Sequence, residues 1–170
     1  MSPPGVRVHV SSACTGWARA LPEAKRLART AAHRALARGM AEAGIEIGHA
    51  IELGIILADD AQQQRLNRDW RGIDRPTNVL AFAAWEVGAP APRGAPVLLG
   101  DVVIACETVA REAAEQGQSV ADHFRHLVVH GVLHLLGYDH DAESAASAME
   151  TLETSILASL GAADPYHRAM

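Results

Sequence analysis

The sequence predicts a single α+β domain in which a small mixed four-stranded sheet is packed by about five helices. The chain has 170 residues, of which 49% are hydrophobic and 21% charged, so it is long enough to bury one proper core. Strand-like segments are interspersed with segments of helical periodicity, and no repeat or low-complexity linker divides them. The short strands and their unequal connections favour α+β over a regular α/β alternation.

Residues 1–170 are therefore predicted to form one domain, with residues 1–5 disordered. The formal net charge of −5 argues against bulk electrostatic coating of nucleic acid but is compatible with a local basic patch. No apolar run approaches the roughly 20 residues that cross a bilayer, and no secretory signal is visible. Cys14 and Cys106 have no C-x-x-C spacing and are predicted to be reduced, with Cys106 buried. We expect a cytoplasmic protein with no membrane partner and no evident stable oligomer.

The first strand and the first helix are predicted near the N-terminus. Residues 6–10 alternate with period two, which is typical of a half-buried strand, and residues 11–16 are a predicted loop. Pro22 suits the first turn of a helix. Apolar residues then recur at helical spacing as far as Gly39 or Gly44.

A second strand and helix follow. Residues 51–57 are apolar enough to form a central strand. Asp59 or Asp60 is a suitable N-cap for the helix that comes next. This helix is expected to run through Trp70 and to end at Gly72.

The next segments contain two more strands and a helix. Residues 79–82 are a predicted third strand, and residues 88–96 are a Gly/Pro/Ala-rich loop. Residues 98–105 are a predicted fourth strand. A helix is expected over residues 108–116 because Gly117 provides its stop.

The last two helices are predicted from a cap, a glycine and a periodic apolar face. Ser119 begins a capping-box-like start for a helix that contains several histidines and ends before Gly137. Residues 142–160 form the final amphipathic helix. Its inner face is marked by Ala145, Met149, Leu152, Ile156 and Leu160.

Three histidines near the end of the fourth predicted helix indicate a metal site. His130 and His134 lie four residues apart in an apolar run, and that spacing places both on one helix face with Cβ atoms roughly 5–6 Å apart. Gly137 can form a left-handed turn that brings His140 towards the same point. Three imidazoles leave a fourth tetrahedral position open, as in catalytic zinc sites. The pattern therefore predicts a metal-dependent hydrolase.

Neighbouring residues narrow this interpretation. A lone buried histidine is usually a packed core residue, and His126 also lies four residues from His130. Only the pair His130 and His134 lies next to the turn at Gly137. His126 is therefore predicted to pack in the core or to support a ligand, and His123 to lie on the surface. In H-E-x-x-H peptidases a Glu general base follows the first histidine, but Gly131 stands there and a peptidase is disfavoured.

A second group of residues has the chemistry of a phosphate site. Four arginines occur between positions 65 and 75, namely Arg65, Arg68, Arg71 and Arg75. The planar guanidinium offers a fork of donors that suits phosphate oxygens, and Trp70 beside it could stack a base. On composition alone, a solvated helix face with a core tryptophan is the favoured interpretation.

Four motifs occur in order along the chain: LADD leading to LNRDWRG (57–72), RPTNVLAF (75–82), LGDVVI (99–104) and HGVLHLLGYDH (130–140). Together with LGAADPY at residues 160–166, they resemble the YbeY family of bacterial endoribonucleases and rRNA maturation factors. The resemblance covers about two-thirds of the chain, and the histidine motif is its most specific part.

The resemblance implies a single-strand-specific metallo-endoribonuclease. Its implied role is late maturation of the small-subunit rRNA 3′ end and ribosome quality control. The implied partners are ribosomal RNA and components of the small ribosomal subunit, and the implied cofactor is one Zn²⁺ per chain. Imidazole also suits copper, iron and nickel, so the residues alone leave the metal open.

The resemblance also assigns roles to residues. It implies that His130, His134 and His140 are zinc ligands and that Arg71 faces the bound metal. Arg71 and His130 are thus the candidate catalytic residues. The further candidates for substrate binding are Arg68, Arg75 and Asn78. The chain departs from the common family pattern at Asn78, Ala81 and Ala83, where Asp, Ser and Pro are frequent.

Two chemical questions stay open at the level of sequence. Either metal-bound water or the 2′-hydroxyl of the RNA attacks the phosphate, while Arg71 stabilises the charge that develops. Asp139 either orients a ligand histidine or caps the turn, and we favour the cap. The alternative functions are a metal hydrolase of small substrates and a non-catalytic, zinc-stabilised ribosome-assembly or RNA-binding factor.

Overall fold

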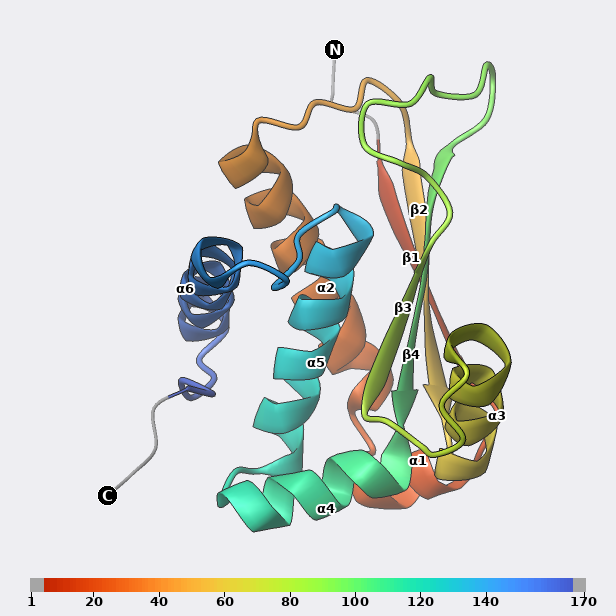
Figure 1. Cartoon of the computed structure of the whole chain (residues 1–170), viewed down its shortest axis with the longest axis vertical. Helices are drawn as coiled ribbons and strands as arrows, with labels where there is room; N and C mark the ends of the chain where they lie inside the picture. Colours follow the sequence, from red (N-terminus) through yellow and green to blue (C-terminus); the bar gives the residue numbers. More distant parts are fainter. Residues whose placement is uncertain (1–4, 167–170) are drawn as a thin grey trace.

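The structure, a computed structural model, describes residues 5–166 (Figure 1). Its elements in chain order are β1 (Val6–Ser12), α1 (Gly16–Ala20), α2 (Ala24–Ala43), β2 (Ile51–Ala58), α3 (Asp60–Arg71), β3 (Val79–Ala83), β4 (Val97–Ala105), α4 (Cys106–Gln116), α5 (Val120–Leu135) and α6 (Glu143–Ser159). The disorder expected for residues 1–5 falls mostly outside the described residues. Gly5 is described, and its carbonyl accepts a hydrogen bond from the Ile51 amide at 3.1 Å.

The described strands form one mixed sheet with the order β1-β2-β4-β3. β1 pairs with β2 and β2 with β4 in parallel, whereas β3 runs antiparallel to β4 and forms an edge. The prediction of a small mixed four-stranded sheet in an α+β domain is therefore confirmed. The antiparallel edge strand β3 matters for function because its first residues line the candidate site.

Helices cover both faces of this sheet (Figure 1). α2 and α5 pack together against one face, and α6 lies outside α5, away from the sheet. α3 lies on the opposite face, against β4, while α1 and α4 contact each other at one end of the molecule. Among residues 5–166, no helix has the length and apolar character needed to cross a membrane.

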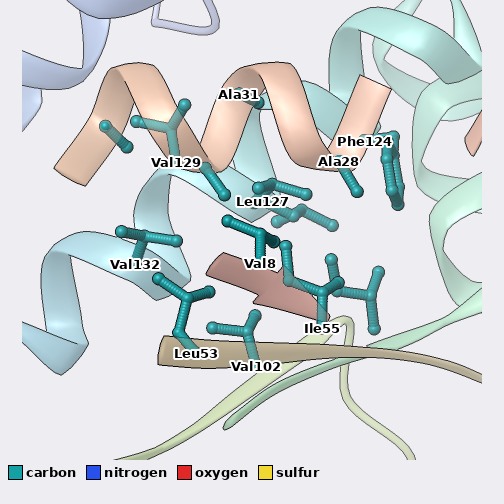
Figure 2. Close-up of a cluster of buried hydrophobic side chains, with 14 of the residues drawn as sticks. Val8, Ala28, Ala31, Leu53, Ile55, Val102, Phe124, Leu127, Val129 and Val132 are labelled. Atoms are coloured by element: carbon teal, nitrogen blue, oxygen red, sulfur yellow. The ribbon is translucent and has the colours of Figure 1, made fainter. Parts of the chain in front are cut away.

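The main core lies between the sheet and the α2–α5 layer (Figure 2). The sheet contributes Val8, Leu53, Ile55 and Val102, and the helices contribute Ala28, Ala31, Phe124, Leu127, Val129 and Val132. The core-facing residues of α2 are mostly alanines, so this helix can approach α5 closely. α5 therefore packs against α2 on one side and against β3 and β4 on another, which fixes the position of its histidines.

The sequence prediction missed one element. Residues 11–16 were expected to be loop, but β1 continues to Ser12 and the five-residue helix α1 begins at Gly16. The indole of Trp17 explains this helix: it is 2% exposed, donates a hydrogen bond to the Ala58 carbonyl at 2.8 Å, and packs edge-on against Phe124. A helix of this length is stabilised by tertiary packing. It is too short to show the periodic apolar pattern from which a helix is predicted.

Candidate metal centre

α5 presents His130 and His134 on one face, one helical turn apart. The helix begins where the Ser119 hydroxyl accepts a hydrogen bond from the Asp122 amide at 3.1 Å, as the capping pattern predicts. The Nε2 atoms of the two half-buried histidines lie 3.0 Å apart, and their ring centroids are separated by 4.5 Å. Two imidazole nitrogens therefore point at one place.

The chain then folds back and brings in the third ring. Gly137 adopts a φ of +93°, and its amide bonds to the His134 carbonyl at 3.0 Å. The Tyr138 hydroxyl donates to the Gly39 carbonyl of α2 at 2.7 Å, which anchors the returning segment. The ring centroid of His140 lies 5.7 Å from that of His130 and 5.2 Å from that of His134.

These three side chains form one potential ligand group. One nitrogen from each of His130, His134 and His140 lies within 4.8 Å of the others. Within residues 5–166, no fourth His, Cys, Asp or Glu joins this group. The three rings that the sequence singled out therefore converge, and protein donors leave room for a further ligand.

A buried carboxylate lies behind His130. Glu153 of α6 is 0% exposed, and its Oε1 accepts a hydrogen bond from His130 Nδ1 at 2.6 Å. Its other oxygen contacts His126 Nε2 at 2.9 Å and accepts a hydrogen bond from the Tyr166 hydroxyl. Burial alone would raise the pKa of Glu153, but these hydrogen bonds from His126, His130 and Tyr166 lower it to about 2.

The ionised carboxylate fixes the proton on His130. Because a carboxylate only accepts hydrogen bonds, Nδ1 of neutral His130 must carry the hydrogen and Nε2 must present its lone pair. Burial lowers the pKa of His134, and the neighbouring His130 and His140 lower it further, which favours the neutral imidazole. Neutral imidazoles are the form that ligates metals.

The spacing also fits a metal ion. Two imidazoles on one tetrahedral zinc at the usual Zn–N distance hold their nitrogens about 3.3 Å apart. The observed Nε2–Nε2 distance between His130 and His134 is 3.0 Å. The donor types and their spacing therefore suit a divalent cation that accepts nitrogen ligands.

A second potential group, His126, His130 and Glu153, shares a histidine with the first. The hydrogen bonds already described occupy its donor and acceptor atoms. We interpret it as a support for His130, in line with the expected supporting role of His126. Glu153 is a supporting residue that was not predicted from the sequence, although one signal was present. Glu153 follows Met149 by four residues and precedes Ile156 by three, which places a carboxylate on the inner face of the last helix.

A pocket of about 420 Å³ lies over the histidine group. Its lining residues come from the end of α3, from the start of β3, from α5 and from the returning turn: Arg71, Asn78, Val79, Leu80, Ala81, His130, Gly131, His134 and His140. The sequence-predicted catalytic residue Arg71 thus shares this pocket with all three histidines.

The end of α3 is held so that Arg71 reaches the pocket. Gly72 takes a φ of +72°, and its amide bonds to the Arg68 carbonyl, which ends the helix where the sequence predicts. The buried side-chain amide of Asn67 donates a hydrogen bond to the Arg75 carbonyl at 2.9 Å. The main-chain carbonyl of Asn67 accepts a hydrogen bond from the Ile73 amide. These contacts tie the loop after the helix to the helix itself.

The predicted substrate-binding residues are distributed unevenly. Asn78 lines the pocket, but its amide group donates to Glu112 at 2.9 Å and accepts from the Val79 amide. Arg68 turns towards Asp69, at 3.2 Å, and Asp74. Arg75 is exposed and is not among the pocket-lining residues.

Gly131 has a packing role. A Cβ atom at this position would lie 2.5 Å from Cγ1 of Val102 in β4, well inside contact distance. α5 therefore approaches the sheet closely here, and a side chain would point towards β4. This geometry gives a physical reason why no glutamate base follows His130.

Two predictions about individual side chains are wrong. Trp70, expected in the core, is 72% exposed, because α3 turns Gln63 and Asn67 inward. Their amides bond to backbone carbonyls, Gln63 to Val103 at 2.9 Å. His123, expected on the surface, is 3% exposed and its Nε2 lies 2.9 Å from Glu112.

The favoured interpretation of Asp139 agrees with the structure. Its carboxylate accepts a hydrogen bond from the Asp141 amide at 3.3 Å, so it caps the turn that leads into His140 and beyond. Cys106 is buried, as predicted.

Comparisons with known proteins agree on one family. A family model described as "Endoribonuclease YbeY" matches residues 21–161. A protein of that name from Paramagnetospirillum magneticum is 52% identical over 162 residues, which are 95% of this chain and 96% of the relative. A second, from Rhodospirillum rubrum, is 52% identical over 163 residues, covering 95% and 82% respectively. A solution structure from Thermotoga maritima superposes with a TM-score of 0.52 at 21% identity, covering 95% of this chain and 99% of that one, and supports the fold alone.

Proposed function

The chain belongs to the YbeY endoribonuclease family, and from this membership together with the histidine pocket we propose that it is a metal-dependent endoribonuclease. The single observation that carries the proposal is the convergence of His130, His134 and His140 on the pocket that Arg71 also lines. A metal ion and a positively charged side chain can both stabilise the negative charge that develops on the phosphate during phosphodiester cleavage.

We propose zinc as the metal because three imidazoles with an open fourth position are the usual ligand set of catalytic zinc. His130, His134 and His140 would hold it. When bound, zinc polarises the phosphate oxygens and lowers the pKa of a coordinated water. The buried Glu153 keeps the Nδ1 proton on His130 and thereby holds this ring in its ligating form.

Arg71 supplies the positive charge from the protein. Its guanidinium is exposed at the pocket, where it can donate to phosphate oxygens and stabilise the charge that builds on them in the transition state. The lining residues within 5–166 include no carboxylate that could serve as a general base. The candidate nucleophiles are a water molecule and the 2′-hydroxyl of the RNA itself. The terminal groups of the products distinguish the two, since a 2′,3′-cyclic phosphate forms only by 2′-hydroxyl attack.

The proposed substrate is single-stranded RNA, in particular the 3′ end of small-subunit rRNA during late maturation in the cytoplasm. The partners would then be ribosomal RNA and components of the small subunit. This part of the proposal rests on the sequence resemblance and on the name of the family. Arg71 supports it, because this exposed arginine lines the pocket in a chain of net charge −5.

Cleavage of single-stranded RNA by the zinc-loaded protein and by its Arg71→Ala variant tests the proposal. We expect kcat/KM to fall by about 100-fold, with zinc content and melting temperature unchanged, because a charge-stabilising donor is lost while the fold is not touched. Arg29→Ala, which removes an exposed arginine of α2, is the matched control and should cleave normally.

Two results would contradict the proposal. Normal cleavage by Arg71→Ala would remove Arg71 from the mechanism. If purified holo-protein fails to cleave RNA, while His130→Ala loses metal and melts, the zinc would only stabilise a non-catalytic assembly factor.

A further inference from the structure

Trp70 is an aromatic residue that the fold leaves in water. It is 72% exposed, more than any other large hydrophobic residue among those described. Its ring packs against that of Phe82 with a centroid separation of 5.9 Å and an interplanar angle of 62°. This edge-on contact supports the indole but covers little of it, so most of the ring surface is open to a ligand.

Neither ring of the aromatic pair lines the metal pocket, but each belongs to a residue that is next in the chain to one that does. Trp70 directly precedes Arg71 at the end of α3, and Phe82 directly follows Ala81 in β3. Arg71 and Ala81 both line the pocket. Successive side chains of a strand point to opposite faces, so Phe82 lies on the α3 side of β3 while Ala81 faces α5. The consecutive elements α3 and β3 thus place the aromatic pair on the other side of the β3 edge from the histidines, with Arg71 between the two sites.

The support beneath Trp70 is rigid. The buried amides of Gln63 and Asn67 fasten α3 to β4 and to the following loop through hydrogen bonds of 2.9 Å. Phe82 sits in β3, which is paired with β4 at Asp101. An exposed ring on such a base loses little conformational entropy when it binds a flat partner.

We propose that Trp70, supported by Phe82, is a stacking site for an unpaired nucleobase of the RNA next to the phosphate held at Arg71. The inference rests on the proposed ribonuclease function and adds a subsite to it. Bases in a duplex are already stacked on each other, so this site selects single-stranded substrate without reading its sequence.

The surroundings favour a nucleobase over an apolar protein surface. Trp70 is flanked in sequence by Asp69 and Arg71, and Arg68 is also exposed at this end of the helix. A single aromatic ring among charged groups is too small an apolar patch for a stable protein interface, which usually needs a contiguous hydrophobic centre. A base with its phosphates presents the matching combination of a flat ring and negative charge.

The test compares Trp70→Leu and Trp70→Phe in the full-length, zinc-loaded protein. Leucine keeps an apolar side chain but removes the ring, so affinity for a fluorescently labelled single-stranded RNA should fall roughly 10-fold or more, and KM should rise accordingly. Phenylalanine should keep affinity within about threefold, because it preserves a stacking face. Leu98→Ser, at an exposed site of β4, is the control and should bind as the wild type does.

Intrinsic fluorescence gives a direct readout of the contact. Single-stranded RNA should quench wild-type tryptophan emission, and Trp70→Phe should bind RNA with a clearly smaller quench. Trp17 is buried, and Trp85, which lines a cavity beside His134, contributes equally in both proteins. If Trp70→Leu binds and cleaves RNA as the wild type does, the subsite is refuted and the exposed ring is left for a protein partner. If the wild-type protein itself neither binds nor cleaves RNA, the proposed function fails first.

Discussion

Glu153 shows how one buried residue can determine the state of a candidate metal ligand. Its Oε1 accepts a hydrogen bond from His130 Nδ1, with 2.6 Å between these two atoms, and its other oxygen is bonded by His126 and Tyr166. We expect Glu153→Gln to weaken zinc binding about 10- to 100-fold, because a neutral amide oxygen is a weaker acceptor and orients the ring less firmly. Competition with a chromophoric chelator measures this affinity.

The matched control is Glu150→Gln, which makes the same change at an exposed position of α6. It should leave zinc affinity unchanged. Equal affinities of the Glu153→Gln and wild-type proteins would show that the carboxylate has only a packing role.

Cys106 provides a prediction about pH. Burial raises its pKa from 9.0 to about 11, and the nearby Cys14, Glu107, Asp60 and Asp59 add to this shift. The thiolate is the reactive form, so at pH 8 only Cys14 should react quickly with a thiol reagent in the folded protein, and both cysteines should react in denaturant. Because the folded state resists ionisation of Cys106, its contribution to stability should decline as pH rises above about 9. Rapid modification of two thiols at pH 8 in the folded state would contradict this assignment.

At this scale, the sequence pointed to the histidines of the candidate metal site but not to the residues that support them. The histidine spacing and the glycine after them are local features, so they could be read directly. Glu153 lies 23 positions from its partner His130, and their contact exists only once α6 packs on α5. Asn78 is a similar case: its hydrogen bond to Glu112 depends on how α4 meets β3.

At the scale of elements, the position of α5 on the sheet sets the geometry of the site. Gly131 lets the helix approach Val102, which is 0% exposed and has no room to move. We expect Gly131→Ala to lower the free energy of unfolding by about 1–3 kcal/mol through overpacking, despite the better helix propensity of alanine. Urea denaturation measures the change, and zinc affinity should fall with it because His130 is the adjacent residue.

A compensating variant tests the cause. Gly131→Ala combined with Val102→Ala removes the methyl groups that the new Cβ would meet. The two substitutions should therefore destabilise less together than the sum of their separate effects. Simple additivity, or a Gly131→Ala protein as stable as the wild type, would mean that the close approach is not tight.

Most element boundaries could be predicted because their signals are local. Asp59 caps α3 through the Gln62 amide at 2.8 Å, and Gly72 and Gly117 end their helices in left-handed conformations. The orientation of a helix was harder to predict. α3 turns polar Gln63 and Asn67 towards the sheet and Trp70 outwards, which the preference of tryptophan for burial does not indicate.

At the scale of the whole molecule, the site is assembled from four elements around an independent core. α3 supplies Arg71, β3 lines the pocket, α5 supplies two histidines, and α6 supplies the carboxylate behind them. The cluster of buried hydrophobic residues reaches from the sheet through α2 and α5 to α6 and includes none of the three metal-site histidines. The fold therefore has a source of stability that does not depend on the metal.

This arrangement predicts the outcome of metal removal. Zinc that binds only the folded state stabilises it by about 4 kcal/mol when its free concentration is 1,000 times the Kd. For a domain of this size, chelation should lower the melting temperature by roughly 10 °C while leaving the far-ultraviolet circular dichroism at 25 °C unchanged. His130→Ala should melt near the temperature of the chelated protein and should no longer respond to chelator. If chelation instead unfolds the protein at 25 °C, the hydrophobic core cannot hold the fold by itself and the metal is a structural one. A catalytic ion can leave a folded enzyme, whereas a structural ion cannot leave without loss of the fold.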